Sequence, residues 1–101
     1  SATTLRPSWF FGRISRREAE KLLLETFSGG YTTYLVRNSQ SYTQDYALSV
    51  KKLDAHGRYY VLSHYLIRKY NRGYYVENIG SHRMFFSVEA LINFHAREYN
   101  S

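Results

Sequence analysis

The chain has 101 residues, 44% of them hydrophobic and 18% aromatic, which suits one compact domain with a single core. Fourteen Lys and Arg residues against eight Asp and Glu residues give a net charge of +6 and a pI near 9.7, so we expect an anionic partner: nucleic acid, an anionic membrane or a phosphoprotein. The absence of cysteine excludes disulfides and a thiolate-dependent phosphatase, and no apolar run approaches the roughly 20 residues of a membrane span.

The N-terminal part of the chain predicts one helix. Residues 1–8 are polar and are interpreted as a linker or the edge of the domain. Ser15 and Glu18 have the spacing of a capping box, which marks the start of a helix. The apolar positions that follow at helical spacing are Ala19, Leu22, Leu23 and Phe27. Gly29 and Gly30 are expected to end the helix.

The middle of the chain predicts strands separated by turn residues. Tyr46, Leu48 and Val50 alternate with smaller side chains, as in a strand with one buried face. The four predicted strands are residues 31–37, 46–50, 59–69 and 74–76. Residues 77–84 are predicted to be irregular, and Ser87 to cap a final helix. The side chains on one face of that helix are Val88, Leu91, Ile92 and His95.

This order of elements predicts an α+β fold, with a central antiparallel sheet sandwiched between two α-helices. Because successive side chains of a strand point to opposite faces of the sheet, residues two apart share a face. Leu35 and Arg37 share one face of their strand, His64 and Leu66 share one face of theirs, and Tyr65 points to the other.

Arg37 lies in an otherwise apolar strand, next to Leu35 and Val36. A guanidinium keeps its charge in proteins, and burying one unpaired costs several kcal/mol or so, so Arg37 needs an anion. One alternative is an internal salt bridge to Asp or Glu. Residues 38–41 (Asn-Ser-Gln-Ser) instead supply donors and no anion, which favours an anion brought from outside.

Five segments resemble the Src-homology-2 domain, most closely its Src-type tyrosine kinase and adaptor members. Residues 34–39 (Tyr-Leu-Val-Arg-Asn-Ser) are similar to the family's Phe-Leu-Val-Arg-Glu-Ser motif, and residues 9–16 resemble its opening Trp-Phe-x-Gly segment. Residues 45–50 resemble its third strand and residues 64–69 its His-Tyr-x-Ile strand. Residues 85–92 resemble its Phe-x-Ser-Leu entry to the second helix.

The resemblance implies a non-catalytic module that binds phosphotyrosine peptides, works in the cytoplasm and is monomeric as an isolated domain. Arg37 and Arg16 would hold the phosphate, helped by the backbone N–H groups of residues 39–41. The implied phosphotyrosine-binding residues are Arg37, Arg16, Ser39, Gln40, Ser41, His64 and Leu66. The implied surface for peptide residues after phosphotyrosine consists of Tyr65, Val76, Ile67 and His95.

Two departures from the Src-type pattern bear on specificity. Leu66 stands where those members usually carry a basic residue against the phosphotyrosine ring. Residues 77–84 form a longer loop, and the sequence within residues 9–101 stops before the family's final loop and Gly-Leu strand. Either the chain was cut there or this is an atypical member. In both cases we expect a half-open pocket for the third residue after phosphotyrosine.

The main alternative is a basic nucleic-acid-binding α+β domain, because residues 58–61 (Arg-Tyr-Tyr-Val) are similar to a basic-aromatic strand of an RNA-recognition motif. That fold needs a different order of elements and a bare sheet face, so we expect no nucleic-acid partner. The sequence contains no Gly-x-Ser-x-Gly, phosphate-loop or His-Glu-x-x-His motif. We therefore predict no catalytic residue, no metal site and no cofactor.

Overall fold

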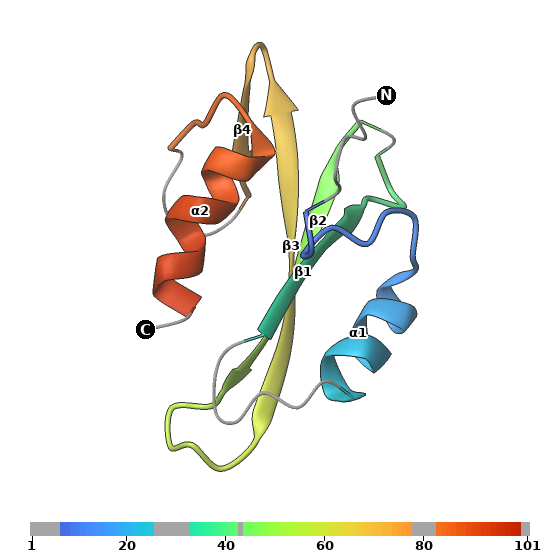
Figure 1. Ribbon diagram of the computed structural model, residues 1–101, viewed down its shortest axis with the longest axis vertical. Coiled ribbons are helices and arrows are strands. Elements are labelled where there is room, and N and C mark those ends of the chain that lie inside the picture. Colours follow the sequence, from blue (N-terminus) through green and yellow to red (C-terminus); the bar gives the residue numbers. More distant parts are fainter. Residues whose placement is uncertain (1–6, 26–32, 43, 78–82, 100–101) are drawn as a thin grey trace.

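The computed structural model describes residues 7–25, 33–42, 44–77 and 83–99, except for the side chains of residues 33 and 96–99. Two helices and four strands follow the predicted order along the chain (Figure 1). The elements are α1 (Arg16–Glu25), β1 (Thr33–Asn38), β2 (Tyr46–Leu53), β3 (Tyr60–Tyr70), β4 (Gly73–Val76) and α2 (Val88–Tyr99).

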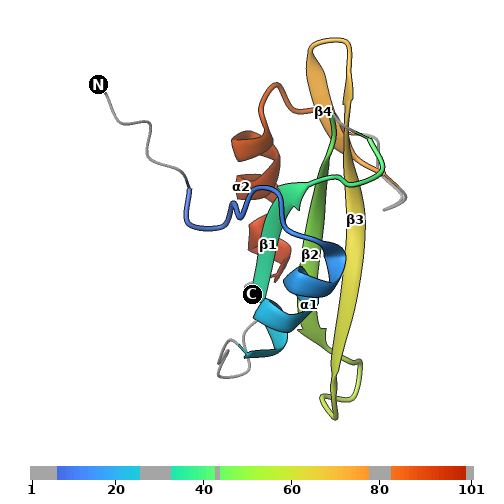
Figure 2. The same cartoon turned by 90° about the vertical axis from the view of Figure 1, so that its right-hand side faces the viewer.

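The four strands form one antiparallel sheet in the order β1-β2-β3-β4. The two helices lie on opposite sides of this sheet, as Figures 1 and 2 show. The predicted α+β sandwich is therefore confirmed. No helix in the described parts of the chain is long and apolar enough to cross a membrane.

Alternation along the strands divides the buried side chains into two clusters. The larger cluster lies between the sheet and α2 and consists of Val36, Leu48, Val50, Ile67, Val76, Leu91 and Ile92. The smaller one lies between the sheet and α1 and consists of Ala19, Leu23 and Leu35. Because Arg37 follows Leu35 by two residues, its side chain is on the α1 face, as predicted.

Both predicted helix starts are confirmed. The backbone N–H of Glu18 donates to Ser15 Oγ (3.0 Å) and that of Ser15 to Glu18 Oε1 (2.8 Å), a reciprocal capping box. Ser87 Oγ accepts a hydrogen bond from the N–H of Ala90 (3.0 Å) at the start of α2. The predicted end of the first helix at Gly29 and Gly30 lies outside the described residues.

The strands differ from their predicted bounds mainly in length. β2 continues to Leu53, three residues past the predicted end, because Lys51 and Lys52 pair with β3 although their side chains break the apolar pattern. β3 ends at Tyr70, which pairs with Gly73 across a turn that contains Asn71 at φ 55°. Asn tolerates this left-handed conformation better than most residues.

Two segments outside the regular strands extend the sheet. Residues 9–12 run beside the outer edge of β1. The N–H of Val36 donates to the Trp9 carbonyl and that of Phe11 to the Val36 carbonyl, both at 2.8 Å, and Phe10 pairs with Val36 in parallel. At the other edge, Phe85 pairs with Tyr74 of β4. The first pairing fixes the chain just before α1 relative to the strand that carries Arg37.

Candidate ligand-binding site

A cavity of about 270 Å³ lies where the start of α1, the loop between β1 and β2, and the middle of β3 meet. Its lining residues are Arg16, Arg37, Ser39, Gln40, Ser41, Tyr42, Ala47, His64, Tyr65 and Leu66. The structure thus brings together all seven residues predicted to bind phosphotyrosine. Their role as ligand contacts stays a prediction.

Arg37 is the buried cation of this site, with 5% of its surface exposed. Its Nε–H donates to Ser49 Oγ at 3.3 Å, and it has no ion pair with any carboxylate in the described parts of the chain. Burial, and then the charge of Arg16, lowers the pKa of Arg37, while Glu20 acts in the opposite direction. The alternative of an internal salt bridge therefore finds no partner among the described residues.

Arg16 is the first residue of α1 and is exposed at the rim of the cavity. Its backbone N–H donates to Gln40 Oε1 at 3.3 Å, which ties the helix start to the β1–β2 loop. Its side-chain Nε lies 3.9 Å from Glu20 Oε2, four residues further along the same helix. A flexible side chain in a long, exposed ion pair is easily redirected towards a stronger anion.

Glu20 requires a correction to the predicted site, which was expected to contain only donors. Its Oε2 accepts a hydrogen bond from His64 Nε2 at 2.8 Å, so a carboxylate lies beside the arginines. This hydrogen bond first, and then the charges of Arg16 and Arg37, lower the pKa of Glu20. The i,i+4 spacing of Arg16 and Glu20 on a predicted helix could have indicated their ion pair, but not the contact of Glu20 with His64.

A hydrogen-bonded chain connects the buried arginine to this carboxylate. Because Arg37 donates to Ser49 Oγ, the Ser49 hydroxyl is free to donate to His64 Nδ1 at 2.7 Å. That leaves the proton of neutral His64 on Nε2, where it faces Glu20. Burial, together with the charges of Arg16 and Arg37, lowers the pKa of His64 although Glu20 opposes this. The chain therefore favours a neutral His64 that orients Arg37 through Ser49.

Ser49, His64 and Glu20 have the residue types and sequence of contacts of a hydrolytic triad, but not its accessibility. Ser49 is fully buried in β2, with 0% of its surface exposed. A nucleophile must reach the substrate, and this hydroxyl cannot. The arrangement is therefore a positioning network behind the cavity.

The β1–β2 loop also differs from the predicted cradle of backbone donors. The N–H of Ser39 donates to the Asp45 carbonyl (3.0 Å) and that of Ser41 to Ser39 Oγ (3.2 Å). Two of the three N–H groups expected to face a phosphate are thus used inside the loop. Of the three, only the N–H of Gln40 has no hydrogen-bond partner among the described residues. The prediction of three available donors is wrong for this conformation of the loop.

Tyr42 is a cavity residue that the sequence reasoning missed. It lies in the β1–β2 loop, and the Cζ of Arg68 is 4.5 Å from the centre of its ring. Arg68 is itself held by Asp45, with Nε 3.2 Å from Oδ2. Nothing in the loop sequence marks this aromatic ring, since its place depends on a cation that comes from β3.

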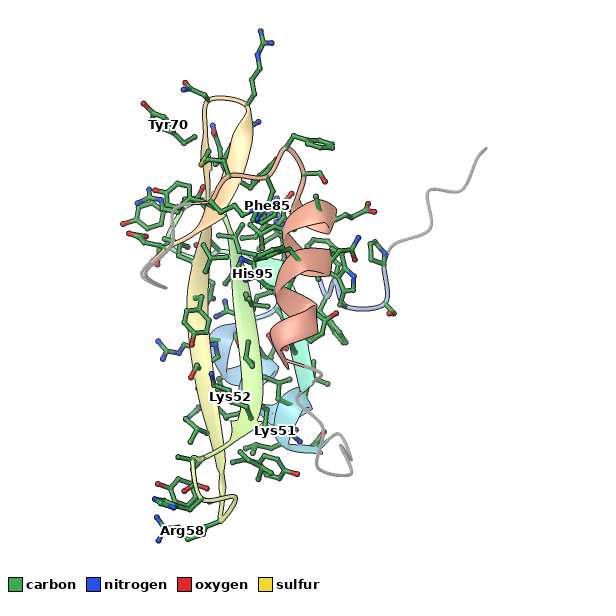
Figure 3. All side chains as sticks on the ribbon, turned by 90° about the vertical axis from the view of Figure 1, so that its left-hand side faces the viewer. Lys51, Lys52, Arg58, Tyr70, Phe85 and His95 are labelled. Carbon is green, nitrogen blue, oxygen red and sulfur yellow. The ribbon has the colours of Figure 1, made fainter. Side chains whose placement is uncertain are left out.

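The four residues predicted to contact the peptide after phosphotyrosine differ in accessibility, and their role as contacts stays a prediction. Ile67 and Val76 are fully buried among the α2-side core residues. His95 is buried too, with its ring 5.8 Å from that of Phe85, and Figure 3 labels both residues. These three side chains point between the sheet and α2, so they pack rather than form an accessible surface. Only Tyr65 is half-buried and lines the cavity.

The comparison with known proteins agrees with this geometry. The family model of the SH2 domain matches residues 9–95, and the chain belongs to this family. It is 41% identical over 85 residues to the tyrosine-protein kinase Src64B of Drosophila melanogaster; the match covers 83% of this chain and 14% of that protein. As an SH2 domain, the chain is a non-catalytic module that binds phosphotyrosine peptides in tyrosine-kinase signalling.

Proposed function

We propose that the cavity between α1 and β3 is the phosphotyrosine site, and that Arg37 and Arg16 bind the phosphate. The observation that carries this proposal is Arg37, a 95% buried cation that lines the cavity and has no carboxylate partner in the described chain. Its planar guanidinium donates two parallel hydrogen bonds to phosphate oxygens, a contact that lysine cannot reproduce. Arg16 supplies the second charge that a phosphate of about −1.5 to −2 requires.

The remaining cavity residues divide into polar and apolar contacts. Ser39 and Ser41 provide hydroxyl donors from the loop that lines the cavity, and Gln40 provides a backbone N–H that no described residue accepts. Leu66 provides apolar contact for the phenol ring in place of a basic residue. His64 acts indirectly, because it holds Ser49, which in turn holds Arg37.

For peptide residues after phosphotyrosine, we propose Tyr65 as the main contact. Ile67, Val76 and His95 act only as the packed support behind it, because all three are buried. An apolar side chain placed on a partly exposed surface gains less than the about 1.5–3 kcal/mol of full burial. Selectivity beyond phosphotyrosine is accordingly modest.

We also propose that the domain acts as a monomer in the cytoplasm and belongs to a larger tyrosine kinase or adaptor, with tyrosine-phosphorylated proteins as partners rather than nucleic acid. The similarity to the tyrosine-protein kinase Src64B supports a larger parent protein, because the match covers only 14% of that protein. The absence of cysteine from the sequence is compatible with a reducing compartment.

The test uses one peptide in three forms, with tyrosine, phosphotyrosine or phosphoserine at the same position. We expect the phosphotyrosine form to bind at least about a hundredfold more tightly than the tyrosine form, a difference of roughly 2.7 kcal/mol. The phosphoserine form should bind like the unmodified peptide. Its side chain lacks the phenol ring and is too short to bring the phosphate to Arg37. Equal affinities measured by isothermal titration calorimetry would contradict the proposal.

A further inference from the structure

Tyr42 lines the cavity and is also exposed to solvent. It lines the same cavity as Arg16 and Arg37, yet 47% of its surface is exposed. No described residue makes a hydrogen bond with its hydroxyl. An enzyme can therefore approach this phenol without unfolding the domain.

The position of Tyr42 is fixed by contacts on both its backbone and its ring. Its N–H donates to Ser39 Oγ at 3.1 Å, and its carbonyl accepts from the N–H of Asp45 at 3.0 Å. Its ring lies against the guanidinium of Arg68, 4.5 Å from Cζ to the ring centre. A group added to the hydroxyl is therefore held on a residue that lines the same cavity as Arg37.

We propose that Tyr42 is a site of tyrosine phosphorylation, and that a phosphate on its Oη closes the cavity to phosphotyrosine ligands. A tyrosine kinase with ATP supplies the phosphoryl group. The Tyr42 oxygen forms a bond to the γ-phosphorus, the bond between that phosphorus and the β–γ bridging oxygen breaks, ADP leaves, and the phenol proton passes to a base of the kinase. This inference rests on the proposed function of the cavity.

The block follows from charge. The cavity contains two cations, Arg16 and Arg37, and Glu20 already offsets part of their charge. A phosphate on Tyr42 adds about −1.5 to −2 charges at the cavity, roughly what the ligand itself brings. The ligand phosphate then meets like charge instead of a net cation. Because the added phosphate is covalently attached, it stays beside the arginines at a high effective concentration.

Tyr59 provides a matched control for this proposal. It is also exposed, at 57%, and also lies against an arginine, with Arg58 Cζ 5.9 Å from its ring centre. It is in the turn between β2 and β3, at the end of the molecule where Figure 3 labels Arg58. That end of the β2–β3 pairing, Leu53 with Tyr60, is six residues along β2 from Ala47 in the cavity, or about 20 Å.

The first experiment compares three forms of the chain: unmodified, with phosphotyrosine encoded at position 42, and with phosphotyrosine encoded at position 59. Fluorescence polarisation then measures the affinity of each for a labelled phosphotyrosine peptide. We expect phosphate at position 42 to weaken binding at least about tenfold, and phosphate at position 59 to change it less than about twofold.

Equal affinities of the unmodified and Tyr42-phosphorylated chains would overturn the block while leaving the proposed function intact. Failure of the unmodified chain to bind the peptide would instead overturn the proposed function, and the block with it. If sedimentation shows that the Tyr42-phosphorylated chain dimerises, its phosphate is bound by a second copy, which would also overturn a block within one molecule.

The second experiment asks whether the hydroxyl is a substrate. The chain and its Tyr42→Phe and Tyr59→Phe variants are incubated with a Src-type tyrosine kinase, ATP and Mg²⁺, and phosphorylated positions are mapped by mass spectrometry. Phosphate at Tyr42 supports the inference. Modification of Tyr59 with none at Tyr42 would overturn it, since both side chains are comparably exposed.

Discussion

The two faces of the sheet are built from the same strands but differ in what they bury. Between the sheet and α2, the buried strand residues are all apolar, as in Val36, Leu48 and Ile67. On the α1 face, Arg37, Ser49 and His64 occupy positions between those residues and form a hydrogen-bonded network. Strand alternation therefore places the apolar core on one face of the sheet and the proposed binding site on the other. Substitutions on the two faces should separate stability from binding.

The largest effect is expected from the α2 face. Ile67→Ala should lower the free energy of unfolding by about 2–5 kcal/mol, because it leaves a cavity among fully buried side chains. Leu66→Ala, one residue away on the α1 face, should lower it by less than about half of that, since Leu66 is only half-buried. Urea denaturation measures both, and equal losses would break the comparison between the faces.

Arg37 should show the opposite behaviour. Arg37→Ala should weaken phosphotyrosine-peptide binding by at least about a hundredfold, or roughly 2.7 kcal/mol, while the free energy of unfolding changes little. Arg37→Lys should lose most of the binding too, because a point charge cannot make the paired contact. Calorimetry and urea denaturation of the same samples check this; an unfolded Arg37→Ala variant would mean that Arg37 has an internal anionic partner.

The two helix caps sharpen the comparison on a smaller scale. Ser15→Ala and Ser87→Ala each remove a hydroxyl that accepts a backbone hydrogen bond, and each should cost about 1 kcal/mol of stability. Only Ser15→Ala should also weaken peptide binding, because α1 carries Arg16. Equal binding by the two variants in polarisation titrations would argue that the position of α1 does not matter for the ligand.

The smallest expected effect is a pH dependence that comes from the α1 face. The pKa of His64 is lowered from its ordinary 6.5, so the unfolded chain takes up this proton at a higher pH than the folded chain. Stability should therefore decline as the pH falls below about 6.5, and Glu20, whose pKa is lowered from 4.5, extends the decline further into acid. His64→Gln should flatten the upper part of a urea-stability profile; the same slope in both proteins would exclude His64 as its source.

The sequence was sufficient to predict those structural features that depend on residues close together along the chain. The capping box of Ser15 and Glu18, the cap at Ser87 and the face of Arg37 follow from local spacing, and all three are confirmed. The burial of His95 agrees with its predicted place on the helix face of Leu91 and Ile92, but its ring contact with Phe85 was not predictable from local spacing. Their environment is set by how α2 packs on the sheet.

Features that depend on contacts between elements were missed for the same reason. Glu20 meets His64 only because α1 lies on the face of the sheet that carries His64. Ser49 meets His64 because these two residues are register partners on β2 and β3. Tyr42 reaches the cavity beside Arg68, which comes from 26 residues further along the chain. A register and a helix position fix such pairs, and neither can be read from spacing within one segment.

The segment that runs beside β1 has a consequence for how the domain behaves in a crowded solution. β1 ends the four-strand order, and the outward N–H groups of Val36 and Asn38 would be open to a passing chain if they were not already bonded to Trp9 and Gly12. An exposed strand edge is a template for aggregation. Residues 9–12 thus cover the edge of β1. A force on the chain that detached them would expose the strand that carries Arg37. We expect tension applied from the N-terminal side to promote self-association before the sheet itself unfolds.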